Sequence, residues 1–364
     1  MQGKGKKIMF VTGHLSGGGA EHVISILASG CADLGAEVVL VVLREGKISY
    51  PVSDKVNLIR IKNGTGKIRI ISRIKQLRKL LKKEKPDAVI PFLPIVTLYT
   101  MIANIGLGIK MIVSERADPY TKTFAPGLSM KDRVGNFLMR RVRLFNLADW
   151  MVFQTPDAQQ YYGIKRQKNS SIIPNPIDIH NLPERFEGER NKVIVAAGRF
   201  AEEKNFPMLI KGFKIFSKKH PEYSLVIYGD GYLRNEYIRL ISEMELDDKV
   251  SLPGFIDDLP EKIYKAAAYV STSNHEGISN SMLEALGMGV PTIVTDCPIG
   301  GSKIFVHTDE NGVLIPMGAV DELALALDKI VVDNQYAEKI SMNAIKIREK
   351  LSKEKICSKW LELI

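Results

Sequence analysis

The sequence predicts an α/β protein with two domains of similar size, each built around a parallel β-sheet. Its 364 residues are enough for about two ordinary domains, and 45% hydrophobic with 25% charged residues excludes a disordered or fibrous chain. Runs of Val, Ile and Leu alternate with stretches of helical spacing, a pattern typical of a parallel sheet covered by helices on both faces. The alternation restarts after the turn IIPNPID at residues 172–178, so we expect the domains to join near residue 175. Ligands would then bind in the cleft between them, at the carboxyl ends of the strands.

The first half begins with a short buried strand, KIMFVT at residues 7–12, followed by a glycine-rich turn and a helix over residues 20–34. Residues 89–109 carry no charge over 21 positions, but Pro91 and Pro94 interrupt them, so we expect a strand and a buried helix there instead of a membrane span. Further strands are predicted at residues 37–43, 57–61, 88–92 and 110–114, and a basic helix is predicted over residues 67–85.

The second half repeats the alternation of strand and helix. Strands are predicted at residues 193–197, 224–228, 250–252, 269–271 and 291–295, and helices at residues 206–218, 233–245, 259–267, 281–287 and 334–363.

The net charge of +10 is divided unevenly along the chain. Residues 1–180 carry 28 Lys and Arg against 13 Asp and Glu, a net charge of +15, whereas residues 181–364 carry 23 against 28, a net charge of −5. The first half is therefore expected to meet something anionic, either nucleic acid or a membrane surface. Three scattered cysteines are too few for a disulfide framework or a four-ligand zinc site, which fits a reducing compartment, and no signal peptide is expected.

A loop after the first strand of each half carries candidate phosphate-binding residues. Gly17, Gly18 and Gly19 lack Cβ atoms, so backbone N–H groups and a helix N-terminus can approach a phosphate; because the spacing is not GxGxxG, a merely tight turn is the alternative. Arg199 and Lys204 lie where a strand gives way to a helix, and two cations there can bind a diphosphate. Ordinary surface charge is the alternative for this pair.

The segment HEGISNSMLEALGMGVP at residues 275–291 places two carboxylates eight residues apart across a loop and the helix that follows it. Glu276 and Glu284 can both accept hydrogen bonds from the hydroxyls of a polyol, while free N–H groups at residues 277–281 face an anion. A capping box formed by Ser281 and Glu284 is the alternative explanation for the second carboxylate.

Together these residues resemble the retaining glycosyltransferases of family 4, which have the two-domain GT-B fold. The resemblance covers nearly the whole chain, through GGAEHVISILA (18–28), IPNPID (173–178), GRFAEEKN (198–205), LVIYGDG (225–231) and EGISNSMLEALGMGVPTIVTD (276–296). It implies two Rossmann-like domains facing a central cleft: residues 1–175 for the acceptor and the membrane, and residues 176–345 for the donor. It also implies that a C-terminal helix at residues 346–364 packs back on the first domain.

The resemblance also implies a role for each site residue. Arg199 and Lys204 would neutralise the diphosphate that leaves with the nucleotide, Glu276 would bind hydroxyls of the donor sugar, and Glu284 would bind the ribose. Backbone amides would contact the phosphates, and Gly254 lies where the family packs the base. The amides implied are those of Gly18, Gly19, Gly277, Ile278, Ser279 and Asn280.

No cofactor and no metal are expected, because the chain has no Asp-x-Asp and cations with helix dipoles would take the place of the metal. The resemblance implies leaving-group-assisted attack by the acceptor on the same face of the sugar. On the acceptor side, relatives often have a histidine where this chain has SERADP (114–119). Glu115, Arg116 and Asp118 are candidates there, with a local salt bridge as the alternative, and His14 is a candidate after the first strand.

Two basic stretches, residues 67–85 and 130–145, are predicted to be amphipathic helices that bind an anionic membrane surface. In the first, Ile71, Leu77 and Leu81 fall on the apolar face, and Arg69 and Arg73 fall on the others. A core helix with a solvated face is the alternative for both. Nucleic acid is not expected as a partner, because no zinc-ligand, RNP-like or OB-type pattern is present.

The sequence thus predicts a retaining glycosyltransferase that moves a hexose or N-acetylhexosamine from a nucleotide sugar, UDP-linked by family frequency, to a polyprenyl-diphosphate-linked glycan. It would act in surface polysaccharide synthesis, in the cytoplasm at the inner face of the membrane. The alternatives are a GDP-mannose-dependent enzyme of the same fold, a Rossmann-type NAD(P)-binding oxidoreductase, and an inactive nucleotide-sugar binding protein.

Overall fold

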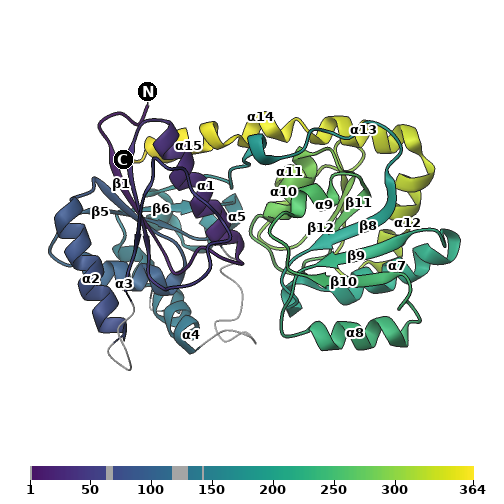
Figure 1. The fold of residues 1–364 in the computed structure, drawn as a ribbon, viewed down its shortest axis with the longest axis horizontal. Coiled ribbons are helices and arrows are strands. Elements are labelled where there is room, and N and C mark those ends of the chain that lie inside the picture. The colour runs from purple at the N-terminus through teal and green to yellow at the C-terminus, as the bar shows by residue number, and fades with distance from the viewer. Residues whose placement is uncertain (1, 63–68, 117–129, 142) are drawn as a thin grey trace. The chain divides into compact units, whose positions relative to one another are not determined.

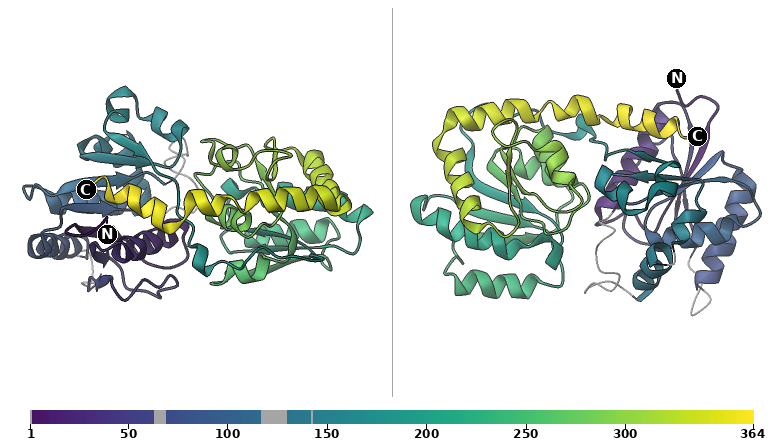
Figure 2. Two further views of the ribbon diagram at one scale, coloured as in Figure 1. Left: turned by 90° about the horizontal axis from the view of Figure 1, so that it is seen from above. Right: turned by 180° about the vertical axis from the view of Figure 1, so that it is seen from behind.

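The computed structural model describes residues 2–62, 69–116, 130–141 and 143–364 (Figure 1). The chain forms two compact units, one of Met1–Pro176 with Leu351–Ile364 and the other of Ile177–Lys350. Each unit has its own parallel sheet, and Figure 2 gives two further views of them. This is the predicted GT-B architecture.

The N-terminal unit holds a seven-stranded sheet in the order β3-β2-β1-β4-β5-β6-β7. Its central strands are almost completely buried because helices cover both faces, which explains their continuous runs of Val, Ile and Leu. The order reverses between β1 and β4, and ligands of open parallel sheets bind at the carboxyl ends of the strands beside such a reversal. The strands are β1 (Lys7–Thr12), β2 (Glu37–Val42), β3 (Asn57–Arg60), β4 (Ala88–Pro91), β5 (Lys110–Ser114), β6 (Trp150–Phe153) and β7 (Ser170–Ile172).

The helices of this unit lie between its parallel strands in the sequence. They include α1 (Gly19–Asp33), α2 (Arg69–Glu84), α3 (Pro94–Asn104), α4 (Met130–Asn136), α5 (Pro156–Tyr161) and α6 (Ile164–Gln167). The uncharged stretch at 89–109 forms β4 and α3 as predicted. Among the residues that the structure describes, no helix combines the length and apolar character that a membrane span needs.

The C-terminal unit holds a six-stranded parallel sheet in the order β10-β9-β8-β11-β12-β13. Its core gathers buried aromatic and aliphatic side chains between the sheet and helices α7, α8 and α12, with Phe200, Phe206 and Tyr237 in mutual edge contacts. The strands are β8 (Asn191–Ala197), β9 (Ser224–Tyr228), β10 (Val250–Gly254), β11 (Ala266–Ser271), β12 (Thr292–Thr295) and β13 (Val313–Ile315). The helices are α7 (Phe206–Lys219), α8 (Arg234–Glu243), α9 (Leu259–Ile263), α10 (Asn280–Gly287), α11 (Gly301–Phe305) and α12 (Val320–Val332).

The C-terminal residues return to the N-terminal unit, where α15 (Lys353–Leu361), yellow in Figure 1, packs against α1. Trp360 is completely buried, 6.2 Å from the ring of Phe92, and the Cys357 thiol is buried against α1. The prediction of one helix over residues 334–363 is wrong, because the path is divided into α13 (Asn334–Ala344), α14 (Ile347–Leu351) and α15. Ser352 begins a new helix by accepting a hydrogen bond from the Lys355 amide.

The two basic stretches differ from their predicted form. Residues 130–145 do not form one helix: α4 is followed by a π-helical turn (Phe137–Arg141) and a 3-10 helix (Leu144–Leu147), because Arg143 has a left-handed backbone that interrupts the path. In α2, Leu77 and Leu81 are buried as predicted, but Ile71 is 56% exposed and Arg73 is only 7% exposed, so the prediction is wrong for these two residues. Residues 67 and 68 lie outside the described ranges.

The predicted helix over residues 259–267 is also too long. Helix α9 ends at Ile263, and the alanines after it begin β11, which pairs with β8 and β12. The alanine run has helical propensity, but burial between two neighbouring strands decides its conformation.

Candidate active site

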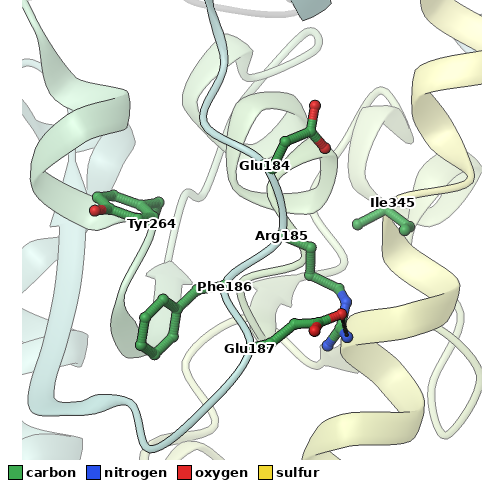
Figure 3. Close-up of a pocket in the computed structure, with 6 residues that line it drawn as sticks. All are labelled: Glu184, Arg185, Phe186, Glu187, Tyr264 and Ile345. Atoms are coloured by element: carbon green, nitrogen blue, oxygen red, sulfur yellow. Dashed lines mark hydrogen bonds and ion pairs between the residues drawn. The ribbon is translucent and has the colours of Figure 1, made fainter.

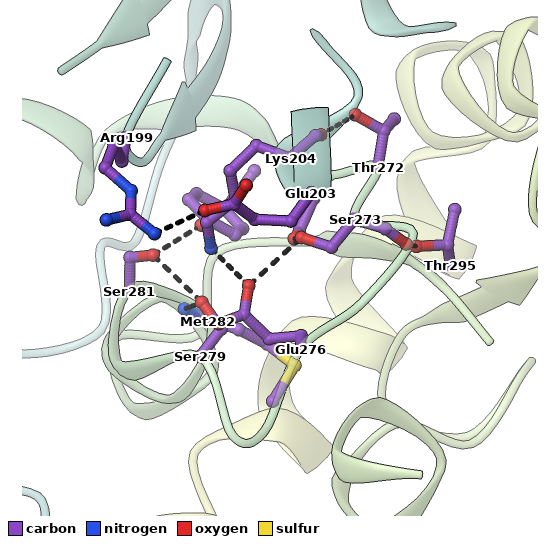
Figure 4. A network of polar contacts seen from close by, with 12 residues as sticks. Arg199, Glu203, Lys204, Thr272, Ser273, Glu276, Ser279, Ser281, Met282 and Thr295 are labelled. Carbon is purple, nitrogen blue, oxygen red and sulfur yellow. Dashed lines mark hydrogen bonds and ion pairs between the residues drawn. The ribbon is translucent and has the colours of Figure 1, made fainter. Parts of the chain in front are cut away.

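The candidate active site of the C-terminal unit lies where β8 and β11 end. These strands are parallel neighbours, so the loops that follow them meet at the same edge of the sheet. Arg199 follows β8, Lys204 ends a short 3-10 turn (Glu202–Lys204), and Glu276 belongs to the loop between β11 and α10. The fold therefore brings together three predicted residues that are far apart in the sequence (Figure 4).

Lys204 and Glu276 form an ion pair between the Lys204 ammonium and Oε2 of Glu276. Their side chains are 15% and 21% exposed, so the pair is mostly shielded from water. Burial opposes the charge on Lys204, but attraction to Glu276 outweighs it and raises the pKa of this ammonium above its ordinary value. Lys204 is therefore a permanent cation at this sheet edge.

Neighbouring hydroxyls hold the ion pair in place. Ser273 donates a hydrogen bond of 3.1 Å to Oε2 of Glu276. The Thr272 hydroxyl lies 3.1 Å and 3.0 Å from the carbonyl oxygens of Lys204 and Asn205, which ties the two loops together. With the cation and the carboxylate fixed before any ligand arrives, little reorganisation is needed when a charged group binds.

Arg199 presents a second cation beside this pair. It donates a hydrogen bond of 2.5 Å to Oε1 of Glu203, one turn along the chain, while 65% of its side chain is exposed. The guanidinium is thus accessible to a ligand and only partly neutralised. The sequence analysis missed Glu203 and Ser273; the spacing of four between Arg199 and Glu203 and the polar run STSN after β11 were the available signals.

The N-terminus of α10 is capped by Ser279, whose hydroxyl accepts from the Met282 amide. Ser281 instead contacts the buried Tyr269 hydroxyl at 2.7 Å, so the capping box of Ser281 with Glu284 is wrong: the helix begins earlier than that alternative requires. The loop before it packs tightly, because a Cβ on Gly301 would lie 1.6 Å from the carbonyl oxygen of Gly277. Gly277 therefore packs closely against Gly301, the first residue of α11, while Ser279 caps α10 and Asn280 begins it.

Glu284 lies in the second turn of α10, where burial raises the pKa of its carboxyl to about 8. Gly254 ends β10 at the same edge of the sheet, with a φ of +94° that favours glycine. Nothing lies within 4 Å of the position that a Cβ on Gly254 would occupy, so the backbone there is open to a flat ligand.

In the N-terminal unit, the loop from β1 to α1 carries His14, Gly18 and Gly19. Gly18 is the N-cap of α1, and 37% of the His14 side chain is exposed. Glu21, in the first turn, is 5% exposed with one oxygen 3.6 Å from the His14 ring.

The other acceptor candidates point inward. Glu115 is buried and accepts a hydrogen bond of 2.6 Å from the Tyr162 hydroxyl. Arg116 donates to Oδ1 of Asn175 at 2.5 Å, its guanidinium lies 4.9 Å and 5.6 Å from the rings of Phe92 and Trp360, and burial lowers its pKa to about 9. These contacts lie within the N-terminal unit. Glu115 and Arg116 do not form the local salt bridge with each other that was the alternative to an acceptor role. Asp118 lies outside the described residues.

A hollow of about 650 Å³ lies elsewhere on the C-terminal unit (Figure 3). Arg185 at its wall is engaged by Glu187 and Glu338, each at 2.8 Å, so its charge is compensated. Its lining carries none of the predicted site residues: it consists of Glu184, Arg185, Phe186, Glu187, Tyr264 and Ile345.

Comparison with known proteins assigns this fold and site to a class. Residues 180–347 match the family model described as glycosyl transferases group 1, and residues 17–181 match the one described as glycosyltransferase family 4. Together the two matches extend over residues 17–347, so the chain is a glycosyltransferase with a GT-B fold.

Individual relatives extend over the whole chain. An uncharacterized glycosyltransferase of Haemophilus influenzae is 25% identical, over 98% of this chain and 99% of its own. A GalNAc-alpha-(1->4)-GalNAc-alpha-(1->3)-diNAcBac-PP-undecaprenol alpha-1,4-N-acetyl-D-galactosaminyltransferase of Campylobacter jejuni is 28% identical, over 98% of each chain. Among solved structures, Anabaena HepE in complex with UDP and glucose superposes with a TM-score of 0.80 over 98% of each chain, at 18% identity.

The raised pKa of Glu284 predicts a pH dependence of stability. Because its pKa is about 8 in the folded protein and near 4.5 when unfolded, the folded state holds the extra proton between these values, and stability falls as pH rises from 4.5 to 8. Glu284→Gln cannot lose a proton, so its stability relative to the wild type should grow over this window, by on the order of 1 kcal/mol or more. Urea unfolding at pH 5 and pH 8 measures this, and a constant difference would contradict it.

Proposed function

We propose that this protein is a retaining glycosyltransferase that moves a hexose or N-acetylhexosamine from a UDP-sugar to a lipid-linked glycan. The observation that carries the proposal is the pair of Lys204 and Glu276 beside the exposed Arg199. Two cations and one carboxylate at one edge are what a sugar diphosphate requires, because its phosphates need positive charge and its sugar hydroxyls need acceptors.

In this proposal, Lys204 and Arg199 bind the diphosphate and stabilise the charge that develops as it leaves. Glu276, which already accepts from Ser273, binds hydroxyls of the donor sugar, and Glu284 binds the ribose. Gly254 accommodates the base, and the amides of residues 277–280 face the phosphates, as do those of Gly18 and Gly19. These assignments follow the matching motifs of the family and the placement of each residue at a strand end.

The names of relatives support the donor and the acceptor. Two Campylobacter jejuni relatives are N-acetylgalactosaminyltransferases acting on undecaprenol-linked glycans, and an Erwinia amylovora relative belongs to amylovoran biosynthesis. Solved neighbours of the same fold hold UDP or UDP-glucose. A GDP-mannose donor is the second candidate, and the oxidoreductase alternative conflicts with membership of a transferase family.

The proposed chemistry retains the configuration of the sugar. The acceptor oxygen forms its bond to the anomeric carbon on the face from which the phosphate oxygen departs, and the acceptor's proton passes to the leaving diphosphate. Lys204 and Arg199 supply the positive charge that stabilises this leaving group. No cofactor and no metal take part.

We also propose that the N-terminal unit lies on the inner face of the membrane. Helix α2 packs against α3, and α3 packs against α4. These helices and the turn after α4 carry exposed large apolar side chains, and we propose that these form the membrane-binding surface with the basic residues of α2. Shallow apolar burial with attraction to anionic lipid is the usual mode of such surfaces. The exposed apolar residues are Ile71, Ile102, Met130, Val134 and Phe137.

The donor site is tested by Lys204→Ala and Glu276→Ala, with the exposed Lys218→Ala at the far end of α7 as the matched control. Loss of either partner should reduce transfer about 100-fold or more, because charge stabilisation in the transition state is lost. Thermal shift with a panel of UDP- and GDP-sugars identifies the donor, and hydrolysis of that donor measures turnover. Normal turnover in Lys204→Ala or Glu276→Ala would contradict the assignment.

Chelation tests metal independence. Because Lys204 and Arg199 stand where a metal would bridge the phosphates, EDTA should leave the rate of donor turnover unchanged. A complete loss that added Mg²⁺ or Mn²⁺ reverses would contradict this part of the proposal.

Flotation with vesicles tests the membrane surface. The protein should bind phosphatidylglycerol vesicles at low salt, and Ile102→Ser with Phe137→Ser should weaken binding, because both side chains are exposed on this surface. Leu325→Ser is the control, because it alters an apolar residue of the C-terminal unit that is 62% exposed, more than Ile102 at 41% or Phe137 at 44%. Binding that is absent at low salt, or equal in both variants, would contradict the proposal.

A further inference from the structure

One histidine at the edge of the N-terminal sheet is held with a fixed orientation of its ring. His14 follows the carboxyl end of β1, beside the reversal of strand order between β1 and β4. Its Nδ1 lies 3.0 Å from the carbonyl oxygen of Ser16 and 3.6 Å from Oε1 of Glu21. Both neighbours can only accept hydrogen bonds, so in the neutral ring the proton belongs on Nδ1.

The other ring nitrogen is left available. Within the part of the chain that the structure describes, Nε2 has no hydrogen-bond partner, and 37% of the side chain is exposed. With Nδ1 protonated, Nε2 carries a lone pair that can accept a hydrogen bond. The carboxyl edge of a parallel sheet is where ligands of such sheets bind, so His14 lies at the edge of the sheet at which a substrate is expected.

Glu21 is placed to serve two groups at once. Its side chain is 5% exposed, and a Cβ on Gly18 would lie 2.0 Å from Oε2, so one oxygen covers the backbone of Gly18 while the other faces His14. Glycine at position 18 is therefore a condition for this carboxylate to fold back. A role in capping the helix would explain why Glu21 lies beside Gly18, but it would not explain why Glu21 also lies beside His14.

We propose that Glu21 is a positioning residue that keeps the proton of His14 on Nδ1, so that Nε2 accepts a hydrogen bond from the attacking hydroxyl of the glycan acceptor. This inference rests on the proposed function and deepens it on the acceptor side. The carboxylate fixes the tautomer of the imidazole as carboxylates beside functional histidines do. In the complex before reaction this hydrogen bond orients the acceptor oxygen toward the donor. As the bond between the anomeric carbon and the diphosphate breaks, the hydroxyl proton turns from Nε2 to the leaving diphosphate, which carries it away as described above.

The tautomer can be measured without any substrate. Long-range ¹H–¹⁵N correlation spectra at pH 8 distinguish the two neutral forms, and the His14 signals are assigned by their loss in His14→Asn. We expect the Nδ1–H form in the wild type and a mixture with the Nε2–H form in Glu21→Gln. A wild type in the Nε2–H form, or an unchanged tautomer in Glu21→Gln, would overturn the proposal. The wild-type spectrum decides even if a variant fails to fold.

Kinetics then separates this role from a structural one. His14→Asn keeps a donor near the position of Nδ1 and removes Nε2, so transfer to a polyprenyl-diphosphate-linked N-acetylhexosamine should fall about tenfold, as expected for one lost hydrogen bond, and should fall by a larger factor than hydrolysis of the UDP-sugar, in which no glycan hydroxyl takes part. His22→Gln is the matched control, because His22 stacks on Tyr50 with ring centroids 4.8 Å apart.

The outcomes distinguish this inference from the function on which it rests. Unchanged transfer in His14→Asn, with normal hydrolysis in the wild type, would overturn the role of His14 alone. A wild type that neither binds nor hydrolyses any nucleotide sugar would overturn the proposed function and this inference together.

Discussion

The ion pair of Lys204 and Glu276 is the interaction on which the candidate site depends. Its partners come from loops after β8 and β11, and only the parallel pairing of these strands brings them together. Because the pair is mostly buried, removing either partner leaves the charge of the other uncompensated, which destabilises the protein. The hydroxyls of Thr272 and Ser273 act on both loops and make them one rigid unit.

The same pairing explains how an acidic half of the chain can hold an anionic donor. The residues after 180 carry a net charge of −5, yet the cations at the sheet edge face carboxylates only one at a time, Arg199 with Glu203 and Lys204 with Glu276. A diphosphate that enters competes with these carboxylates for the cations. Displacement would release Glu276 for the sugar hydroxyls, so binding of the phosphates and of the sugar would be coupled through one lysine.

Much of the fold could be predicted from the sequence, because parallel strands that are buried on both faces consist of continuous runs of Val, Ile and Leu. Residues 110–114 and 224–228 were predicted with the observed bounds. The strands β6, β7 and β13 were missed because each has only three or four residues, too few to show a period. In α2 the apolar pattern correctly predicted that Leu77 and Leu81 are buried, but Arg73 is buried with them and Ile71 is exposed, since tertiary packing decides how much of the helix is covered.

The sequence motifs predicted which residues follow the strands of the candidate site. They could not predict the surroundings of each side chain, which decide its charge and its hydrogen bonds. Glu21, Glu276 and Glu284 are all glutamates near a helix N-terminus, yet the structure gives them three different surroundings. Glu276 pairs with a lysine, Glu21 has one oxygen beside Gly18 and the other beside a histidine, and burial raises the pKa of Glu284 to about 8. With a pKa of about 8, the carboxyl of Glu284 is mostly protonated near neutral pH and can donate as well as accept a hydrogen bond. The spacing of residues in the sequence therefore identifies these carboxylates. Whether each one carries a proton depends on its burial and on its neighbours in the folded protein.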